Sequence, residues 1–444
     1  MLISPNREKV PDPVYPLGLS YLSSALKQKG HDVASLDLCF VDDIDTAIRQ
    51  SIESFGPDVI GLSLRNIDDV SYPRSVCYVD NYKDIVGLAR KYSDAKIVLG
   101  GAGLTIMPEA FMKELDADYA IAGEGESAFL SLIEDLEAGR AVKEGIIRSD
   151  NMKSDIWTDI VPDRTLFDAD TYYEQGGMLN IQTKRGCPFQ CIYCSYPLIE
   201  GRSYRMRTPG AFVEELSYVV DNTGVRHFFI VDSVFNHPVD YAESICDAII
   251  DRDLDIQWTC YGTPLGMTDR LAEKMKRAGC VSIEFGIDSL IDEQLAVLKK
   301  GFTCEDIRSA ADTCRSHGIK QCHFIFVGAP GDTIDSVNLN LERLESLGAD
   351  VSMIMAGIRI FPNTALAAIA KEDLNIQEEE ITLKPVYYIS PEVIGHIHTI
   401  VEEIKDNHPK WVMPGFEVNI SEKLQALLRK AGIKGSLWEE LIKR

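Results

Sequence analysis

Several features that would define other protein classes are missing from this sequence. No apolar run approaches the roughly 20 residues that a membrane-spanning helix needs. The first residues, MLISPNREKV, lack the basic-then-apolar layout of a secretion signal. We therefore expect a cytoplasmic protein without a membrane span. The 45 Lys and Arg against 69 Asp and Glu give a formal net charge of −24, which argues against the basic face that nucleic-acid binding requires.

A disulfide framework is also missing, although the chain has 11 cysteines. An odd number in a long cytosolic chain, mostly scattered, is typical of small buried hydrophobes rather than of paired half-cystines. Three cysteines are clustered instead, in the segment KRGCPFQCIYCSY. Cys187, Cys191 and Cys194 follow the spacing C-x3-C-x2-C, and this cluster requires its own explanation.

The 444 residues are enough for two or three domains. Residues 1–140 alternate strand-like segments (MLISP, HDVASLDL, 58–64, AKIVLG, ADYAIAG) with helical ones. This alternation predicts an α/β domain with a doubly wound, Rossmann-like parallel sheet. Such sheets bind ligands at the carboxyl ends of their strands, where this chain carries the glycine-rich turns GGAG at 100–103 and GEGE at 123–126.

The rest of the chain divides into three parts. Residues 141–178 are polar and are expected to form an irregular linker. Residues 179–372 contain six further strand-helix units, which predict a partial (β/α)6 barrel with its active site at the carboxyl ends of the strands. Residues 373–444 carry amphipathic segments and are expected to form a small, mostly helical C-terminal domain.

The cysteine cluster directly follows the first expected barrel strand, so we place it on a loop at the catalytic face. Three thiolates on one short loop can hold a soft metal centre. Structural zinc needs four ligands, and no nearby cysteine or histidine supplies a fourth. An electron-transfer cluster usually has four cysteines as well, whereas three leave one iron open. A zinc site or an unrelated thiol cluster is the alternative.

This arrangement, with an aromatic residue before the last cysteine, resembles the radical S-adenosylmethionine (SAM) superfamily. The resemblance implies a [4Fe–4S] cluster on Cys187, Cys191 and Cys194, whose open iron binds SAM and cleaves it to a 5′-deoxyadenosyl radical. It further implies SAM contacts at the strand ends, from Tyr193, Asp232, Ser233, Asp288, Ser289, Gly328 and Pro330. An aspartate at a strand end is equally often a helix cap.

Residues 1–140 resemble the cobalamin-binding domain that precedes many radical SAM barrels, through YPLGLSYLSSALKQKGHDVASLDL, PDVIGLSLRN, KIVLGGAGLTIMPE and ADYAIAGEGE. The resemblance implies that the nucleotide tail of cobalamin threads between sheet and helix. The residues expected along it are Gly100, Gly101, Gly103, Thr105, Gly123, Gly125 and Glu126. NAD is the rival ligand, but its glycine fingerprint belongs in the first βα turn, where this chain has PNREKVPDPVYPLG.

The D-x-H-x-x-G loop of other cobalamin proteins, which supplies a histidine below cobalt, is missing. We therefore expect no histidine ligand from the protein. The loop Leu64–Arg65–Asn66 is expected at the lower corrin face, where Arg65 cannot be an ordinary ligand because it stays protonated. The alternative for Arg65 is a salt bridge to Asp68 or Asp69.

Together these resemblances imply a cobalamin-dependent radical SAM methyltransferase. It would move a methyl group from SAM via methylcobalamin to an unactivated carbon or phosphorus of a small-molecule, lipid or peptide substrate, with flavodoxin or ferredoxin as electron donor. One alternative is a non-methylating cyclase, ring-contracting enzyme or mutase of the same architecture; another is a corrinoid carrier or regulatory protein. Six C-terminal residues could line the substrate pocket or belong to the core: Tyr387, Tyr388, His396, His398, Trp411 and Trp438.

Overall fold

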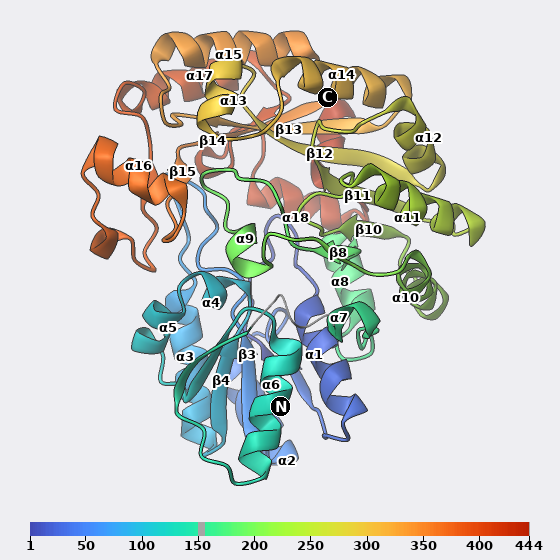
Figure 1. The fold of residues 1–444 in the computed structure, drawn as a ribbon, viewed down its shortest axis with the longest axis vertical. Coiled ribbons are helices and arrows are strands. Elements are labelled where there is room, and N and C mark those ends of the chain that lie inside the picture. The colour runs from blue at the N-terminus through green and yellow to red at the C-terminus, as the bar shows by residue number, and fades with distance from the viewer. Residues whose placement is uncertain (150–155, 444) are drawn as a thin grey trace.

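The computed structural model describes residues 1–149 and 156–443. An N-terminal α/β part lies below a larger barrel part in Figure 1. The strands of the N-terminal sheet are β1 (Leu2–Ser4), β2 (Ser35–Asp37), β3 (Val59–Ser63), β4 (Lys96–Gly100), β5 (Tyr119–Ala122) and β6 (Gly145–Arg148). All neighbours are parallel, in the order β2-β1-β3-β4-β5-β6, so the predicted doubly wound sheet is confirmed.

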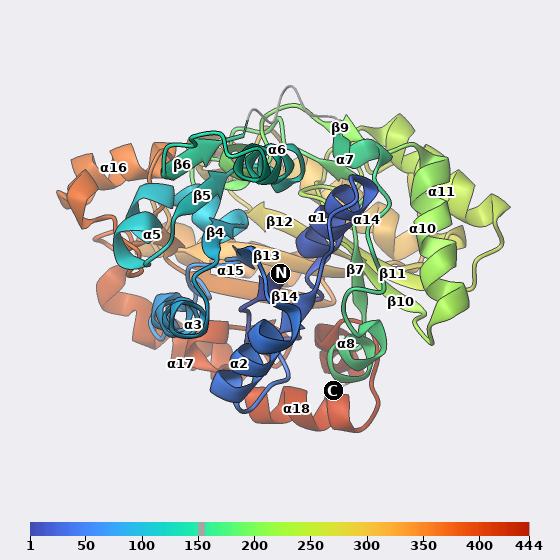
Figure 2. The ribbon, with the colours of Figure 1, turned by 90° about the horizontal axis from the view of Figure 1, so that it is seen from below.

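Helices cover both faces of this sheet. They are α1 (Leu17–Gln28), α2 (Ile44–Phe55), α3 (Val79–Tyr92), α4 (Ala102–Ile106), α5 (Pro108–Glu114) and α6 (Gly125–Glu137). Helix α1 packs beside α6, and α2 packs beside α3, as Figure 2 shows from below. The ends of α2 follow from its sequence, because Asp43 accepts a hydrogen bond from the amide of Thr46 and Gly56 ends the helix at a φ of 62°.

The segment 141–178 differs from the expected irregular linker. Strand β6 lies within it and pairs with β5 through Ile146 and Ile147, and two helices follow, α7 (Ile156–Asp159) and α8 (Ala169–Gly176). The expectation of irregular structure is therefore wrong for these stretches, because two apolar residues suffice to add an edge strand. Residues 150–155 of the segment lie outside the described residues, and the domain boundaries stay predictions.

A second parallel sheet forms the barrel. Its strands are β7 (Leu179–Ile181), β10 (His227–Ile230), β11 (Gln257–Gly262), β12 (Cys280–Asp288), β13 (Lys320–Val327), β14 (Val351–Ala356) and β17 (Trp411–Val412). Their order is β17-β14-β13-β12-β11-β10-β7. The six predicted barrel strands are confirmed, and β17 adds a seventh from the C-terminal region. Two hairpins flank the sheet, β8 (Lys184–Arg185) with β9 (Arg205–Met206), and β15 (Ile358–Arg359) with β16 (Tyr387–Tyr388).

Helices alternate with the barrel strands and cover their outer side, except α9, which lies between the barrel and the N-terminal domain and packs against α4. They are α9 (Tyr196–Ile199), α10 (Pro209–Asn222), α11 (Val239–Asp251), α12 (Asp269–Arg277), α13 (Asp292–Val297), α14 (Cys304–Ser316) and α15 (Ile334–Leu347). The C-terminal region is largely helical, as expected, with α16 (Ala365–Leu374), η1 (Glu378–Glu380), η2 (Ile394–His396), α17 (Ile397–Asn407), η3 (Pro414–Phe416), α18 (Glu422–Lys430) and η4 (Leu437–Lys443). None of the helices within the described ranges is long and apolar enough to cross a membrane.

Candidate active site

The three clustered cysteines lie on the loop that follows strand β8. Cys187 is 6% exposed, and Cys191 and Cys194 are partly buried. Burial, together with the charges of Cys191 and Cys187, raises the pKa of the Cys194 thiol to about 12, so the three sulfurs lie near one another. Among the residues described, no three His, Cys, Asp or Glu side chains are placed to share one metal ion. A polynuclear cluster fits this donor set, because each of its irons takes its own thiolate.

A buried ion pair fixes the base of this loop to the end of β10. Lys184 and Asp232 are both fully buried, with 3.1 Å between Nζ and Oδ2. The backbone amides of Thr183 and Lys184 donate to Oδ1 of Asp232, and Lys184 Nζ also donates to the carbonyl of Phe235. The expected contact between Asp232 and SAM is not supported by this geometry, because the chain itself occupies both carboxylate oxygens. Asp232 instead holds the cysteine loop in place.

Other expected SAM contacts lie in turns at the strand ends. Ser233 donates to the carbonyl of Gly186 at 2.9 Å, directly before Cys187. Ser289 is buried and accepts from the amide of Ile291, so it closes the turn after β12. Gly328 has a φ of 87° and Pro330 follows it in the turn after β13; the amide of Gly328 donates to Asp332, and the carbonyl of Pro330 accepts from Gln294. Their contacts with SAM stay predictions.

Tyr193 and Asp288 meet beside the cysteines, together with a lysine that the sequence did not single out. The Tyr193 hydroxyl donates to Oδ2 of Asp288, and Lys300 Nζ lies 2.6 Å from the same oxygen. Lys300 is only 5% exposed. Burial opposes its charge, but Asp288 and the thiolates of Cys191 and Cys194 raise its pKa above the usual value. A buried cation beside the cysteines is a counter-charge for a thiolate-bound cluster; the dipeptide Lys299–Lys300 gave no signal of this.

A cavity of about 240 Å³ opens at the carboxyl ends of the N-terminal strands. Its walls come from β3, β4, β5, α1 and α6 and include Gly18, Leu22, Ser63, Gly100, Gly101, Thr105, Gly123, Gly125, Glu126 and Phe129. A Cβ atom at Gly100 would meet nothing within 4 Å. A glycine-rich cavity at the strand ends, closed on its other side by Gln182, Arg185, Ile199 and Glu200 of the barrel part, fits the tail of a corrinoid.

Gly101 and Gly103 have a structural role in addition to the expected contact with the cobalamin tail, which stays a prediction. A Cβ at Gly101 would lie 2.7 Å from the carbonyl oxygen of Leu64, and one at Gly103 would lie 2.9 Å from the carbonyl carbon of Asn66. These glycines therefore let the turn after β4 pack against the loop after β3. Thr105 joins the same contact, because its hydroxyl donates to the carbonyl of Gly101 and accepts from the amide of Gly123. The glycines position the loop that carries Arg65.

Glu126 also has a partner other than the expected cobalamin tail. Its carboxylate accepts from Arg185 Nη2 at 2.8 Å, and the neighbouring Glu124 pairs with Arg205. The Arg185 guanidinium lies over the Trp157 ring, 4.5 Å from its centroid. Both glutamates begin α6, whereas both arginines belong to the hairpin of the cysteine loop. These ion pairs join the N-terminal domain to the barrel.

Arg65 is exposed and forms no hydrogen bond or ion pair with any described residue. The alternative salt bridge is not formed, because Asp68 pairs with Arg359 at 2.9 Å and Asp69 accepts from Ser75. Burial raises the pKa of Tyr261 and the charge of Arg65 opposes this rise, so the guanidinium lies near the end of β11. A loop of the N-terminal domain thus faces the mouth of the barrel with an unpaired positive charge.

Of the six C-terminal candidates, Trp438 forms a hydrogen bond with a residue on a barrel strand, and Tyr388 belongs to an apolar cluster against which Tyr193 and Phe326 pack. Trp438 donates to the buried carboxylate of Glu284, on β12, at 2.8 Å. The other five lie as follows: Tyr387 against Tyr72, Tyr388 on Asp373, Trp411 stacked on His408, His398 beside Phe416, and His396 at the start of α17.

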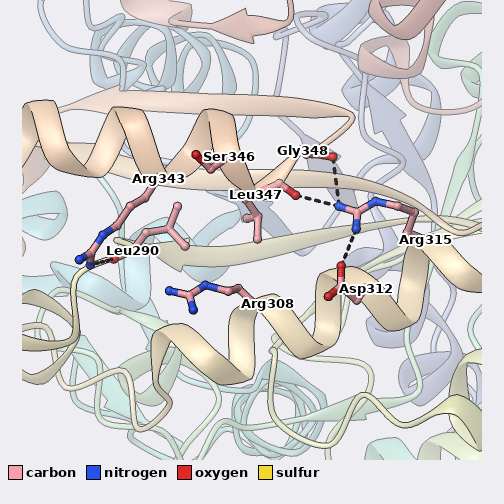
Figure 3. A pocket seen from close by; sticks show the side chains of 8 residues that line it. All are labelled: Leu290, Arg308, Asp312, Arg315, Arg343, Ser346, Leu347 and Gly348. Atoms are coloured by element: carbon pink, nitrogen blue, oxygen red, sulfur yellow. Dashed lines mark hydrogen bonds and ion pairs between the residues drawn. The ribbon is translucent and has the colours of Figure 1, made fainter.

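A larger cavity of about 530 Å³ lies on the outer side of the barrel, between α14, α15 and the turn after β12 (Figure 3). Arg308, Arg315 and Arg343 point into it. Arg315 donates to the carbonyls of Leu347 and Gly348 at the end of α15, and Arg343 donates to the carbonyl of Leu290. Arg315 and Arg343 therefore bond to a helix end and a turn, whereas Arg308 pairs with Glu305 on its own helix. The residues that line the cavity include none of the clustered cysteines.

Comparison with known proteins assigns both domains. Residues 3–133 match the family model of the B12 binding domain, and residues 181–344 match that of the radical SAM superfamily. An uncharacterized methyltransferase of Pyrococcus horikoshii is 28% identical over 79% of this chain and 77% of its own. Tryptophan 2-C-methyltransferase of Streptomyces laurentii is 24% identical over 82% of this chain and 73% of its own.

Among solved structures, the radical SAM methyltransferase TsrM of Kitasatospora setae, with tryptophan and a SAM analogue bound, has a similar fold. The TM-score is 0.89 at 23% identity, over 100% of this chain and 97% of that one. The B12-binding and radical SAM matches correspond to the two parts that the structure joins through Glu124, Glu126, Arg185 and Arg205. The chain therefore belongs to the cobalamin-dependent radical SAM enzymes.

Proposed function

We propose that this protein is a methyltransferase that moves a methyl group from SAM, through its corrinoid, to an unactivated carbon of a small molecule. The observation that carries the proposal is the meeting of three parts at one space. Helix α9, which begins two residues after Cys194, packs against α4 of the N-terminal domain. The turn that begins α4 packs in turn against the Arg65 loop. The charge of Arg65 also lowers the pKa of Tyr196 and of Tyr261, which burial raises, so this loop lies near both the cysteine loop and the end of β11.

Each group of residues described above has its own role in this proposal. Cys187, Cys191 and Cys194 hold the cluster, and Lys300 with Asp288 sets the charge beside it. The cavity at Gly100 receives the corrinoid tail. When bound, the cluster and SAM supply a carbon radical and a methyl donor, and the corrinoid carries the methyl group. The ion pairs of Glu126 and Arg185 keep the two domains, and so these groups, at a fixed separation.

The proposal extends to the partners of the enzyme. A small-molecule substrate is supported by the relatives, among which one is named for tryptophan. A lipid or peptide substrate, and flavodoxin or ferredoxin as cytoplasmic electron donor, are further parts of the proposal. A cyclase, ring-contracting enzyme or mutase of the same architecture is the less favoured alternative. Both relatives compared above are named as methyltransferases, whereas a relative that is 25% identical over 76% of this chain is named as a cyclase.

The test is anaerobic turnover of the reconstituted protein with SAM labelled in the methyl group. L-tryptophan and an extract of small molecules serve as substrates, and a strong chemical reductant replaces the electron donor. We expect label in a small-molecule product, and none with a Cys191→Ala variant, which cannot complete the cluster. Cleavage of SAM to 5′-deoxyadenosine without labelled product, together with a rearranged substrate, would show a mutase or cyclase instead.

A further inference from the structure

The interior of the barrel is not filled by its own side chains. Partly exposed side chains occur at alternate strand positions: Phe229 and Val231 at β10, Tyr261 on β11, Phe324 and Phe326 on β13, Met353 and Met355 on β14. The side chains between them are buried against the outer helices: Phe228, Ile230, Cys260, Ile325 and Ile354. Since successive strand residues point to opposite faces, the partly exposed set faces inward. In a fully packed barrel this inner set would be buried; here it surrounds accessible space.

Among the inward positions described, Glu284 on β12 carries a carboxylate. Two residues before it on the same face, the hydroxyl of Ser282 lies 2.6 Å from that of Thr259. Glu284 lies on β12 between Tyr261 of β11 and Cys322 of β13, with which it is in register. It is 7% exposed. Trp438, which packs with Cys322 inside the barrel, donates to Oε1 at 2.8 Å.

The second oxygen of Glu284 has no hydrogen-bond partner among the described residues, and it is not sealed inside the protein. A buried carboxylate that lacks a partner is costly to keep. Burial raises the pKa of Glu284 to about 7; the Trp438 hydrogen bond opposes this rise, whereas Glu439 and Asp12 add to it. A hydrogen-bond donor arriving from the interior would stabilise the ionised form.

Tyr261 stands beside this free oxygen. Its side chain is 37% exposed although it lies within a strand, and Phe229 holds its ring edge-to-face at 4.9 Å. Its hydroxyl has no partner among the residues that the structure describes. The interior therefore presents one free carboxylate oxygen and one free hydroxyl, surrounded by aromatic rings and methionines.

We propose that the substrate is a molecule with an apolar, ring-sized body and a hydrogen-bond-donating nitrogen, and that Glu284 Oε2 binds this nitrogen beside Tyr261. The inference rests on the proposed function only in taking the occupant to be the molecule that is methylated. A carboxylate accepts hydrogen bonds from N–H groups and repels other carboxylates. Glu284 therefore orients the substrate with its nitrogen toward β12 and excludes an orientation that would bring a substrate carboxylate there. Glu284 and Tyr261 are thus specificity residues of the barrel.

The test compares two matched pairs of probes on the anaerobically reconstituted holoenzyme, with binding followed by ligand-observed NMR. Indole and 1-methylindole differ only by the ring N–H, and tryptamine and 3-ethylindole differ by the ammonium group. We expect the nitrogen donor of at least one pair to bind ten times more tightly, which corresponds to about 1.4 kcal/mol. In Glu284→Ala this preference should vanish. The matched control is Glu273→Ala, an exposed glutamate on the outer helix α12, which should keep it.

Iron content and the thermal midpoint will show whether the Glu284→Ala protein folds. If it folds poorly, a second variant, Glu284→Gln, carries the test. Glu284→Gln keeps an acceptor oxygen without the charge. It should retain a preference for indole over 1-methylindole but lower any preference for tryptamine at least fivefold. The inference is overturned if neither pair shows a preference in the native protein, or if the preference survives in both Glu284 variants. Transfer of the SAM label is measured separately, so failure here would leave the proposed methyl transfer standing.

Discussion

At the scale of single residues, the buried ion pair of Lys300 and Asp288 should contribute strongly to the stability of the fold. Asp288 is 3% exposed, and removal of one member of a buried pair leaves the other uncompensated. We expect Lys300→Met to lower the free energy of unfolding by about 3 kcal/mol. The double variant Asp288→Asn/Lys300→Met should recover part of that loss. Denaturant titrations of both variants and of Asp288→Asn complete a double-mutant cycle; a cost below about 1 kcal/mol in the single variant would refute this account.

Arg65 carries a second positive charge near the reaction space, and unlike Lys300 it has no ion-pair partner among the described residues. A guanidinium below the corrin would offer no lone pair to cobalt and would exclude water, whereas an imidazole is a good ligand. We predict four-coordinate cobalt in the Co(II) form of the native protein. In Arg65→His, EPR should show a fifth, nitrogen ligand. The control is Arg74→His, since Arg74 is 70% exposed and pairs with Glu417. A five-coordinate signal in the native protein would mean that Arg65 does not guard this face.

Residue types alone identified the cysteines but not their surroundings. A short run with three thiols is visible in the sequence because the ligands are neighbours along the chain. Lys300 lies 106 positions after the last cysteine, and Glu284 and Tyr261 meet only when β11 and β12 pair. The ion pairs of Asp232 and Glu126 were not predicted for the same reason, since their partners Lys184 and Arg185 come from other elements. Such pairings depend on tertiary contacts, which the local pattern does not contain.

At the scale of elements, two turns pack against each other through Gly101. Its φ of 100° is unfavourable for other residues, and a Cβ there would collide with the backbone of Leu64. Gly139 offers a matched comparison, because its φ is 64° but its Cβ would meet nothing within 4 Å. We expect Gly139→Ala to cost about 1 to 2 kcal/mol through conformation alone. Gly101→Ala should lower the free energy of unfolding by more than Gly139→Ala does, because its Cβ also displaces the Arg65 loop.

Cobalamin affinity separates the two glycine variants further. The loop at Gly101 borders the expected tail cavity, whereas Gly139 follows α6 at the far end of that helix. Cobalamin binding, followed by its visible absorbance after gel filtration, should weaken in Gly101→Ala and stay unchanged in Gly139→Ala. Equal binding in both proteins would place the tail elsewhere.

Helices and strands themselves were largely predictable. The alternation of apolar segments gave the six barrel strands and five of the N-terminal strands in their order, because buried parallel strands are continuous apolar runs. The two short edge strands were not predicted from the sequence: β6 has four residues and β17 has two. A strand of this length is defined by the neighbour with which it pairs, and its own sequence shows no periodicity.

At the scale of the whole molecule, ion pairs hold the two domains together. Burial opposes the ionisation of Glu126, but Arg185 outweighs it and lowers the pKa of the carboxyl below its usual value. A lowered folded-state pKa gives stability that is present above the unfolded value, about 4.3, and that is lost as the pH falls through the folded value. We therefore expect Glu126→Gln to lower the thermal midpoint at pH 7.

The difference in thermal midpoint between Glu126→Gln and the native protein should begin to narrow below about pH 4.3, where Glu126 of the unfolded chain takes up a proton, and should close as the pH falls through the lower folded-state value. Calorimetric scans from pH 7 to pH 3.5 measure it. Glu134→Gln is the control, because Glu134 is an exposed residue on the same helix. If the difference in thermal midpoint stays constant with pH, the lost stability of Glu126→Gln comes from altered packing and not from the lost charge.

The alternation of side chains along the barrel strands has a consequence for redirecting this enzyme. The cysteines and glycines that are expected to hold the cofactors lie on loops and turns at the strand ends, whereas Phe229, Tyr261, Glu284, Phe324 and Met353 lie on the strands themselves and face inward. Mutagenesis restricted to these inward positions would change which substrate binds and would leave the residues expected to hold the cofactors unchanged. Divergent members of such a lineage can therefore acquire new substrates by few replacements, without rebuilding the chemistry that they share.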